Sequence, residues 1–243
     1  MPFNKDIILT HSGNILPFKK LVDYGYNIHH YPMINIKSNE NIKPFPLENN
    51  DYYIFTSKNA VDAFFNYPFI QVQYDKKIKA ICSGIKTAHK LREYGVSPIF
   101  ISKSSYAEDL AYELLESKII NDSNVMLVLG NLASSDLENT IKDFTTVNRI
   151  NVYSTFLNQS QDKGIVELIN NGDSIVVFAS PSSFRAFYNL YDLNKIDIIS
   201  IGNTTTRYIQ KLGFNTVVTS KSQSLEGVVY EIIEKYKIND IKI

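Results

Sequence analysis

The chain contains two copies of one long segment, and this internal duplication limits the possible folds more than any other feature. The stretch FTSKNAVDAFF at residues 55–65 is repeated as FASPSSFRAFY at residues 178–188. A second stretch, which begins GIKTAHKLREYG at Gly84, is repeated without a gap as GNTTTRYIQKLG from Gly202. Two long copies indicate a duplicated domain, because a solenoid needs three or more short repeats to close its core.

Apolar runs of strand length alternate along the chain with amphipathic, helix-like stretches. This alternation indicates an α/β fold in which helices cover both faces of parallel sheets. Gly95 and Gly213 follow two of the predicted helices, where a left-handed C-terminal cap favours glycine. The predicted strands are Asp6–Thr10, Tyr52–Thr56, Ile78–Ser83, Ser97–Ser102, Val125–Gly130, Ser174–Ser180, Ile196–Gly202 and Asn215–Ser220. The predicted helices are Leu16–Tyr24, Thr87–Tyr94, Ala107–Glu116, Thr205–Leu212 and Leu225–Tyr236.

The two copies alone supply too few strands for two stable domains. Two further segments, Asp6–Tyr31 and Val125–Tyr153, are each predicted to form a strand, a helix and a strand. If one segment joins each copy, the 243 residues form two similar lobes of about 120 residues. The order of the segments leaves open which of them joins which lobe.

Several classes of protein are disfavoured by the composition. No apolar run reaches the roughly 18 residues of a membrane-spanning helix, and the first residues lack the layout of a signal peptide. Cys82 is the only cysteine, and the four histidines lack the spacing of paired metal ligands. Lys plus Arg equals Asp plus Glu at 25 each, without a basic cluster. We therefore expect a cytoplasmic protein without a metal, which binds neither membranes nor nucleic acid.

Four polar motifs each follow a predicted strand and open a helix. They are TSKNA at 56–60, GIKT at 84–87, SPSS at 180–183 and GNTT at 202–205. Parallel sheets bind ligands beyond the carboxyl ends of their strands, where free backbone N–H groups at helix starts attract anions. Each Ser, Thr or Asn taken alone is more often a simple helix cap, and the glycines could serve only tight turns. Four such motifs together favour an acidic small molecule, bound in a cleft between the lobes.

Five motifs in this order resemble those of the uroporphyrinogen-III synthase family. They are Thr56-Ser57-x-Asn59-Ala60-Val61, Gly84-x-x-Thr87-Ala88, Val152-Tyr153-x-Thr155, Ser180-Pro181-Ser182-Ser183 and Gly202-x-x-Thr205. The resemblance covers nearly the whole chain. It implies two α/β lobes, each a parallel sheet flanked by helices, joined by a two-stranded linker near Asn35–Lys37 and Asn151–Ser154. One lobe then comprises residues 1–34 and 155–243, and the other comprises residues 38–150.

The resemblance also implies the reaction of that family, which uses no cofactor. The linear tetrapyrrole hydroxymethylbilane loses its terminal hydroxyl as water to give an azafulvene. The substituted carbon of ring D attacks this electrophile, and the spiro intermediate fragments and recloses to uroporphyrinogen III with ring D inverted. The enzyme class is then a cyclising hydro-lyase. We expect a monomer that makes at most a transient contact with the preceding enzyme of the pathway.

The resemblance places site residues on the motifs of this sequence. Tyr153 matches a tyrosine with a suggested general-acid role; a phenol is protonated at neutral pH and could donate to the departing hydroxyl. The alternative is a structural tyrosine, since the chain has 16. The implied substrate-binding residues are Thr56, Ser57, Asn59, Ala60, Gly84, Thr87, Ser180, Ser182, Ser183, Gly202, Thr204 and Thr205.

The sequence departs from the pattern of the family at two strand ends. Where the family often has Thr-Arg-Pro, this chain has Thr10-His11-Ser12, and where the family often has Arg-Gly, it has Leu129-Gly130-Asn131. We therefore do not expect arginines to bind substrate carboxylates at these two places. The rival function is that of a non-catalytic, two-lobed protein that binds a tetrapyrrole or another anion in the same cleft.

Overall fold

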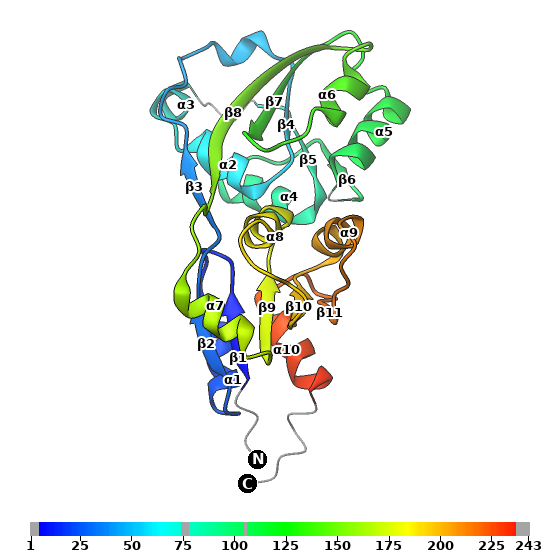
Figure 1. Cartoon of the computed structure of the whole chain (residues 1–243). Helices are drawn as coiled ribbons and strands as arrows, with labels where there is room; N and C mark the ends of the chain where they lie inside the picture. Colours follow the sequence, from blue (N-terminus) through cyan, green and yellow to red (C-terminus); the bar gives the residue numbers. More distant parts are fainter. Residues whose placement is uncertain (1–4, 74–77, 105, 237–243) are drawn as a thin grey trace. The chain divides into compact units, whose positions relative to one another are not determined.

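The computed structural model describes residues 5–73, 78–104 and 106–236. The chain forms two compact units, each with its own sheet (Figure 1). Unit 1 comprises Met1–Asn35 and Phe156–Ile243, and unit 2 comprises Ile36–Thr155. Each of the four hydrophobic core clusters lies entirely within one unit, so each unit has a core of its own.

The sheet of unit 1 has the order β11-β10-β9-β1-β2, and its strands pair in parallel. Alternate residues of each strand point to opposite faces. Ile7 and Leu9 pack on one face with α10, whereas Ile8 packs on the other with α7, α8 and α9. The strands are β1 (Asp6–Leu9), β2 (Asn27–His30), β9 (Ser174–Phe178), β10 (Ile196–Ser200) and β11 (Val218–Thr219). The helices are α1 (Lys19–Val22), α7 (Lys163–Asn170), α8 (Pro181–Tyr188), α9 (Asn203–Lys211) and α10 (Leu225–Lys235), with a 3-10 turn at Leu16–Phe18.

The sheet of unit 2 has the order β3-β8-β7-β4-β5-β6. Its buried residues again alternate: Phe55 and Val128 pack with α2 and α4, whereas Ile54 and Leu127 pack with α5 and α6. The strands are β3 (Ile34–Ser38), β4 (Tyr52–Phe55), β5 (Ala80–Ser83), β6 (Phe100–Ser102), β7 (Asn124–Gly130) and β8 (Thr146–Leu157). The helices are α2 (Lys58–Phe65), α3 (Pro68–Gln73), α4 (Gly84–Glu93), α5 (Ala107–Ser117) and α6 (Asp136–Ile141), with a 3-10 turn at Leu47–Asn49.

The duplication seen in the sequence is repeated in the order of the strands. The order β6-β5-β4-β7-β8 in unit 2 corresponds to β11-β10-β9-β1-β2 in unit 1. The predicted α/β fold with two parallel sheets flanked by helices is confirmed. In each unit the chain leaves the central pair of strands in opposite directions, which places a topological switch point between β4 and β7 and another between β9 and β1.

The predicted elements are present, and most of their bounds differ by a few residues. Gly95 and Gly213 have φ of 78° and 87°, which confirms their predicted place after α4 and α9. The helices predicted from Thr87 and Thr205 begin earlier, at Gly84 and Asn203. The predicted helix Leu16–Tyr24 is split into a 3-10 turn and a short α-helix, and a proline lies in the first positions of that turn.

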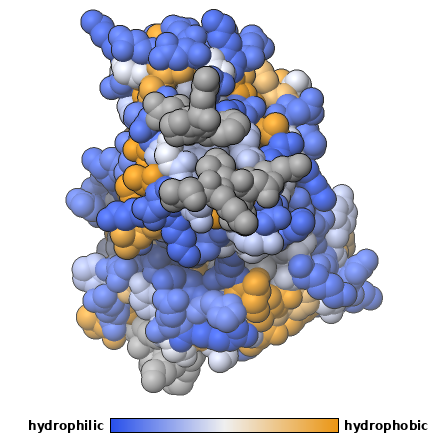
Figure 2. All heavy atoms as spheres, turned by 90° about the horizontal axis from the view of Figure 1, so that it is seen from below, coloured by the Kyte–Doolittle hydropathy of each residue, from blue (hydrophilic) through white to orange (hydrophobic). Residues whose placement is uncertain are grey.

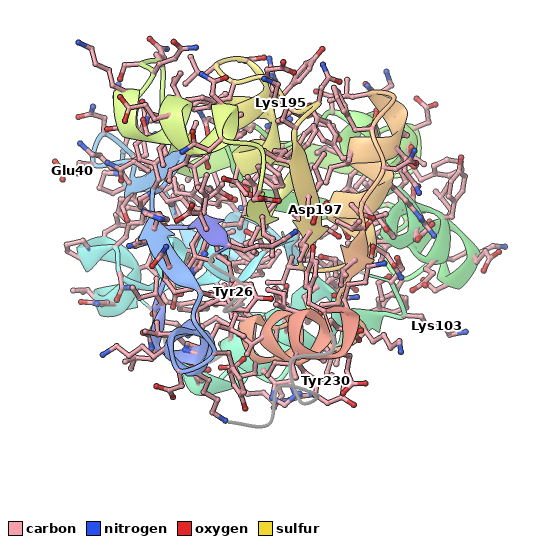
Figure 3. All side chains as sticks on the ribbon, turned by 60° about the horizontal axis from the view of Figure 1, so that its bottom comes forward. Tyr26, Glu40, Lys103, Lys195, Asp197 and Tyr230 are labelled. Atoms are coloured by element: carbon pink, nitrogen blue, oxygen red, sulfur yellow. The ribbon has the colours of Figure 1, made fainter. Side chains whose placement is uncertain are left out.

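A polar network closes the amino-terminal edge of the unit 1 sheet. Asp197 on β10, labelled in Figure 3, forms an ion pair with Lys5 at 3.3 Å and accepts a hydrogen bond from the hydroxyl of Tyr236 at 2.5 Å. Burial raises the pKa of Tyr236, and the bond to Asp197 raises it further. This network lies at the edge opposite the polar motifs, so we assign it a structural role.

Across the described ranges, no helix combines the length and the apolar character that a membrane crossing needs. Hydrophilic residues predominate on the face shown in Figure 2, with smaller hydrophobic groups among them. Cys82 is fully buried on β5.

Candidate functional site

In unit 2, residues from three adjacent strands meet at the switch point between β4 and β7. Ser57 follows β4, Gly130 ends β7, and Tyr153 lies opposite Gly130 on β8. The Ser57 Oγ and the Tyr153 hydroxyl oxygen are 3.3 Å apart. This is the position at which open parallel sheets bind their ligands.

A β-bulge directs Tyr153 toward this position. Leu129 pairs with Asn151 while Gly130 pairs with Tyr153, so Val152 is an extra residue on β8. An extra residue interrupts the alternation of side chains and re-aims those beside it. Accordingly Val152 and Tyr153, although adjacent, both pack against the same core cluster.

Ser57 links the phenol of Tyr153 to the start of α2. Its side chain is the N-cap of that helix and accepts a hydrogen bond from the backbone N–H of Ala60 at 3.1 Å. The helix start carries a partial positive charge that favours nearby anions. Ser57 is therefore a helix cap, as the structural alternative predicted, and it also contacts Tyr153.

The loop after β7 holds the backbone around Tyr153 in place. The N–H of Asn131 donates to the carbonyl oxygen of Tyr153 at 3.1 Å. The side-chain oxygen of Asn131 accepts the N–H of Thr155 at 2.8 Å. These two bonds fix the backbone on the carboxyl side of Tyr153.

The neighbouring strand β5 brings the motif GIKT next to TSKNA. The Ser83 hydroxyl donates to the carbonyl oxygen of Thr56 at 3.0 Å, which joins the two strand ends. Gly84 has a φ of 68°, in the left-handed region that favours glycine, and α4 begins there. Thr87 in the first turn is only 5% exposed.

Unit 1 carries an equivalent arrangement at its own switch point. Ser180 caps α8 in a capping box: its Oγ accepts the N–H of Ser183 at 3.1 Å, and the Ser183 hydroxyl bonds back to the Ser180 backbone. The Ser182 and Ser180 hydroxyl oxygens are 3.0 Å apart. On the other side of the switch point, Thr10 and His11 follow β1. The Thr10 hydroxyl donates to the carbonyl oxygen of Val177.

The motif GNTT follows β10 and has one exposed threonine. Gly202 is buried with an extended backbone, and a Cβ there would lie 2.7 Å from the side chain of Gln223. Thr204 is exposed in the first turn of α9, whereas Thr205 is 2% exposed. The next residue, Thr206, forms a hydrogen bond with Ser200 at the end of β10, and their hydroxyl oxygens are 2.5 Å apart.

The expected site residues therefore fall into two groups by exposure. The side chains of four expected site residues are buried and could act only through the backbone or the packing of the helix start: Ala60, Thr87, Ser183 and Thr205. The remaining side chains are at least partly accessible at the strand ends: Thr56, Ser57, Asn59, Ser180, Ser182, Thr204 and Tyr153. Contact of any of them with a ligand stays a prediction.

Three residues at these edges were not expected from the sequence. Lys58 and Lys86 are exposed in the first turns of α2 and α4, and their charges interact: partial desolvation lowers the pKa of Lys86, and Lys58 lowers it further. The sequence analysis could have found both lysines, because they lie inside the motifs TSKNA and GIKT. His11, 7% exposed, was noted only as a departure from an arginine.

Comparisons with known proteins support one family. The family model described as uroporphyrinogen-III synthase HemD matches residues 18–230. No curated protein sequence matches the chain.

Three solved structures share the fold. A mutant uroporphyrinogen III synthase from Thermus thermophilus has a TM-score of 0.72 at 13% identity, covering 96% of this chain and 99% of that one. The uroporphyrinogen-III synthetase of Helicobacter pylori has a TM-score of 0.68 at 22% identity, covering 95% and 99%. The wild-type Thermus thermophilus synthase has a TM-score of 0.57 at 14% identity, covering 97% and 99%.

Proposed function

Since the chain belongs to the uroporphyrinogen-III synthase family, we infer that it closes hydroxymethylbilane to uroporphyrinogen III. Ring D is inverted and one water is lost, so we assign the enzyme to the cyclising hydro-lyases. The small-molecule substrate follows from the family. A monomeric state, a cytoplasmic location and a transient contact with the preceding enzyme stay predictions.

The pair formed by Tyr153 and Ser57 is the observation that best supports a catalytic role for this chain. Because the Ser57 Oγ accepts the N–H of Ala60, its own hydrogen is free to point at the Tyr153 oxygen, 3.3 Å away. The phenol hydrogen of Tyr153 is then free to point at a ligand. We therefore assign Tyr153 as the proton donor.

In the proposed first step, Tyr153 protonates the hydroxyl that leaves. The carbon–oxygen bond of the terminal hydroxymethyl group breaks, and the hydroxyl leaves as water with the phenol proton of Tyr153. The pyrrole nitrogen supplies the electron pair and keeps its proton, so the product is the protonated azafulvene cation, whose charge balances that of the phenolate; transfer of the N–H proton to the phenolate would give the neutral azafulvene and restore Tyr153. The resulting phenolate lies beside the Ser57 hydroxyl and the start of α2, which both favour negative charge.

The eight carboxylates of the substrate are bound, in this proposal, mainly by helix starts. The chain has no net formal charge, so it offers no strong basic surface as a whole. The first turns of α2 and α4 in unit 2 and of α8 and α9 in unit 1 present backbone N–H groups at strand ends. Lys58 and Lys86 add positive charge at two of them.

The identity of the product tests the proposed function. Pure, metal-free protein is incubated with hydroxymethylbilane, and the oxidised products are separated by isomer. We expect mainly the type III isomer, because the uncatalysed reaction gives the symmetrical type I isomer. A product mixture equal to that of the control without protein would overturn the proposal and favour a non-catalytic tetrapyrrole-binding protein.

A further inference from the structure

We propose that Gly130 is a positioning residue for Tyr153, because only a residue without a side chain leaves the phenol room to reach Ser57. This inference rests on the proposed function, in which Tyr153 donates a proton. Gly130 is buried at the carboxyl end of β7 and is the register partner of Tyr153 on β8.

The geometry around Gly130 shows how close the phenol lies. A Cβ added at Gly130 would be 2.3 Å from Cζ, 2.6 Å from Cε2 and 2.7 Å from the hydroxyl oxygen of Tyr153. These three atoms are its nearest neighbours, and all belong to the far end of one side chain. The φ of Gly130 lies outside the left-handed region, so the backbone itself does not require glycine. Glycine is required here because the phenol approaches so closely.

An added methyl group would therefore move the phenol rather than the backbone. Carbon atoms in contact are separated by about 3.5–4.0 Å, and Cζ would lie only 2.3 Å from the Cβ, so the end of the ring would have to shift by roughly 1.2–1.7 Å. The hydroxyl is already 3.3 Å from Ser57 Oγ, and a hydrogen bond is lost at about 3.6 Å. A shift of this size displaces the hydroxyl from the position in which it meets Ser57 at the start of α2.

The backbone of Tyr153 cannot follow such a shift without breaking other bonds. Asn131 bonds to the carbonyl oxygen of Tyr153 and to the N–H of Thr155. Val152, the extra residue of the bulge, is fully buried in the core cluster against which Tyr153 packs, so it anchors the preceding backbone. The ring is thus free to adjust only through its own torsions, which turn the hydroxyl away from its place.

The test is a double-mutant cycle between Gly130→Ala and Tyr153→Phe. We expect Gly130→Ala to lower kcat about 10- to 100-fold with KM nearly unchanged, the loss expected when water partly replaces a general acid. In the Tyr153→Phe background, Gly130→Ala should lower kcat no further, because there is no hydroxyl left to position. A merely structural effect of the methyl group would lower kcat in both backgrounds.

The matched control is Gly164→Ala, at an exposed position in the first turn of α7 in unit 1. It introduces the same methyl group and should leave kcat at the wild-type value. Thermal unfolding gives a second, independent readout. Any destabilisation by Gly130→Ala should disappear in the Tyr153→Ala background, where the ring that meets the methyl group is gone.

Three outcomes would overturn the inference. The first is a folded Gly130→Ala enzyme with the wild-type kcat. The second is a loss of kcat that persists undiminished in the Tyr153→Phe background. The third is a Tyr153→Phe enzyme as fast as the wild type, which would remove the role that Gly130 is proposed to support. Failure of the proposed function is separate, because it would appear as loss of the type III product in the wild-type protein itself.

Discussion

The side chain of Tyr153 has an apolar and a polar environment at once. Its ring packs against the core cluster around Phe55 and Val128, while its hydroxyl reaches Ser57. The packing of the ring agrees with a structural role, whereas the catalytic role of the hydroxyl stays a prediction. A substitution that keeps the ring and removes the hydroxyl can separate them.

Tyr153→Phe should lower kcat about 10- to 100-fold, because one proton donor is lost while water can partly replace it. The type III isomer should still be formed, since the conformation of the bound substrate does not depend on this proton. Kinetics and isomer separation measure both effects. The matched control is Tyr94→Phe, which loses a hydroxyl bonded to Asp62 at 3.0 Å on the same unit and should keep its rate. Unchanged kinetics in both variants would make Tyr153 structural.

His11 should make the stability of the protein depend on pH. Burial lowers its pKa from 6.5, a bond to the Asn14 backbone opposes this, and nearby His30 lowers it further. Its Nδ1 is buried without a hydrogen-bond partner among the described residues. As pH falls below 6.5, the unfolded chain binds a proton before the folded one does. Stability is therefore highest above that pH and falls until the lowered pKa is reached.

Urea unfolding at about pH 7.5 and about pH 5.5 measures this effect. The loss of unfolding free energy between the two values should be smaller in His11→Asn than in the wild type. His89→Asn changes an exposed histidine on α4 and should behave like the wild type. Equal losses in all three proteins would contradict the assigned role of His11.

At the scale of elements, the starts of the helices serve both stability and the proposed binding. The caps of α2 and α8 are formed by Ser57 and Ser180, which are also expected to contact the substrate. Replacement by alanine would disturb both tasks together. Aspartate separates them, because it caps a helix as well as serine does but carries a negative charge.

Ser180→Asp should leave the melting temperature equal or higher, since an anion is favoured at a helix start. It should weaken binding of the anionic substrate by about 0.3–1 kcal/mol, which raises KM about two- to fivefold. The control is Ser224→Asp at the N-cap of α10, beside the edge strand β11 and away from the switch point. An unchanged KM in Ser180→Asp would show that the substrate does not bind near the start of α8.

An aspartate at Thr87 or Thr205 would test binding of the substrate less clearly than Ser180→Asp does. Both side chains are nearly fully buried, so a charge there would have to be desolvated in the core. Loss of activity would then report unfolding rather than binding. Thr204, exposed in the first turn of α9, is the informative position of that motif.

At the scale of the whole molecule, each unit buries its own apolar residues. The two clusters of unit 2 contain no buried residue from unit 1, and the reverse also holds. Unit 2 is continuous in the chain from Ile36 to Thr155, whereas unit 1 combines Met1–Asn35 with Phe156–Ile243. A domain with its own core and continuous chain can fold alone.

We therefore expect the fragment of residues 36–155 to unfold cooperatively, with a free energy of about 5–15 kcal/mol. Circular dichroism during urea titration measures this. The fragment of residues 156–243 is the control: it has β9, β10 and β11 but lacks β1 and β2, so it should not fold alone. A fragment 36–155 without a cooperative transition would show that unit 2 needs the rest of the chain.

Much of the fold was predictable because its signals are local. The alternation of buried strands with helices, the glycines after α4 and α9, and the caps at Ser57 and Ser180 depend on neighbouring residues. The family resemblance depends on short motifs of the same kind. The sequence pattern did not reveal the short length of β11 at the edge of its sheet.

The sequence by itself determined that the chain is a duplicated α/β protein with polar motifs at its strand ends. The order of the segments left open which strands pair, and only the family resemblance implied it; the tertiary structure pairs β1 with β9 and β7 with β4. Only the tertiary structure decided that Thr87 and Thr205 are buried. It also placed the bulge at Val152 and the phenol of Tyr153 against Gly130. These features depend on strand pairing between distant segments, and the free energy of such pairing comes from contacts that no local periodicity records.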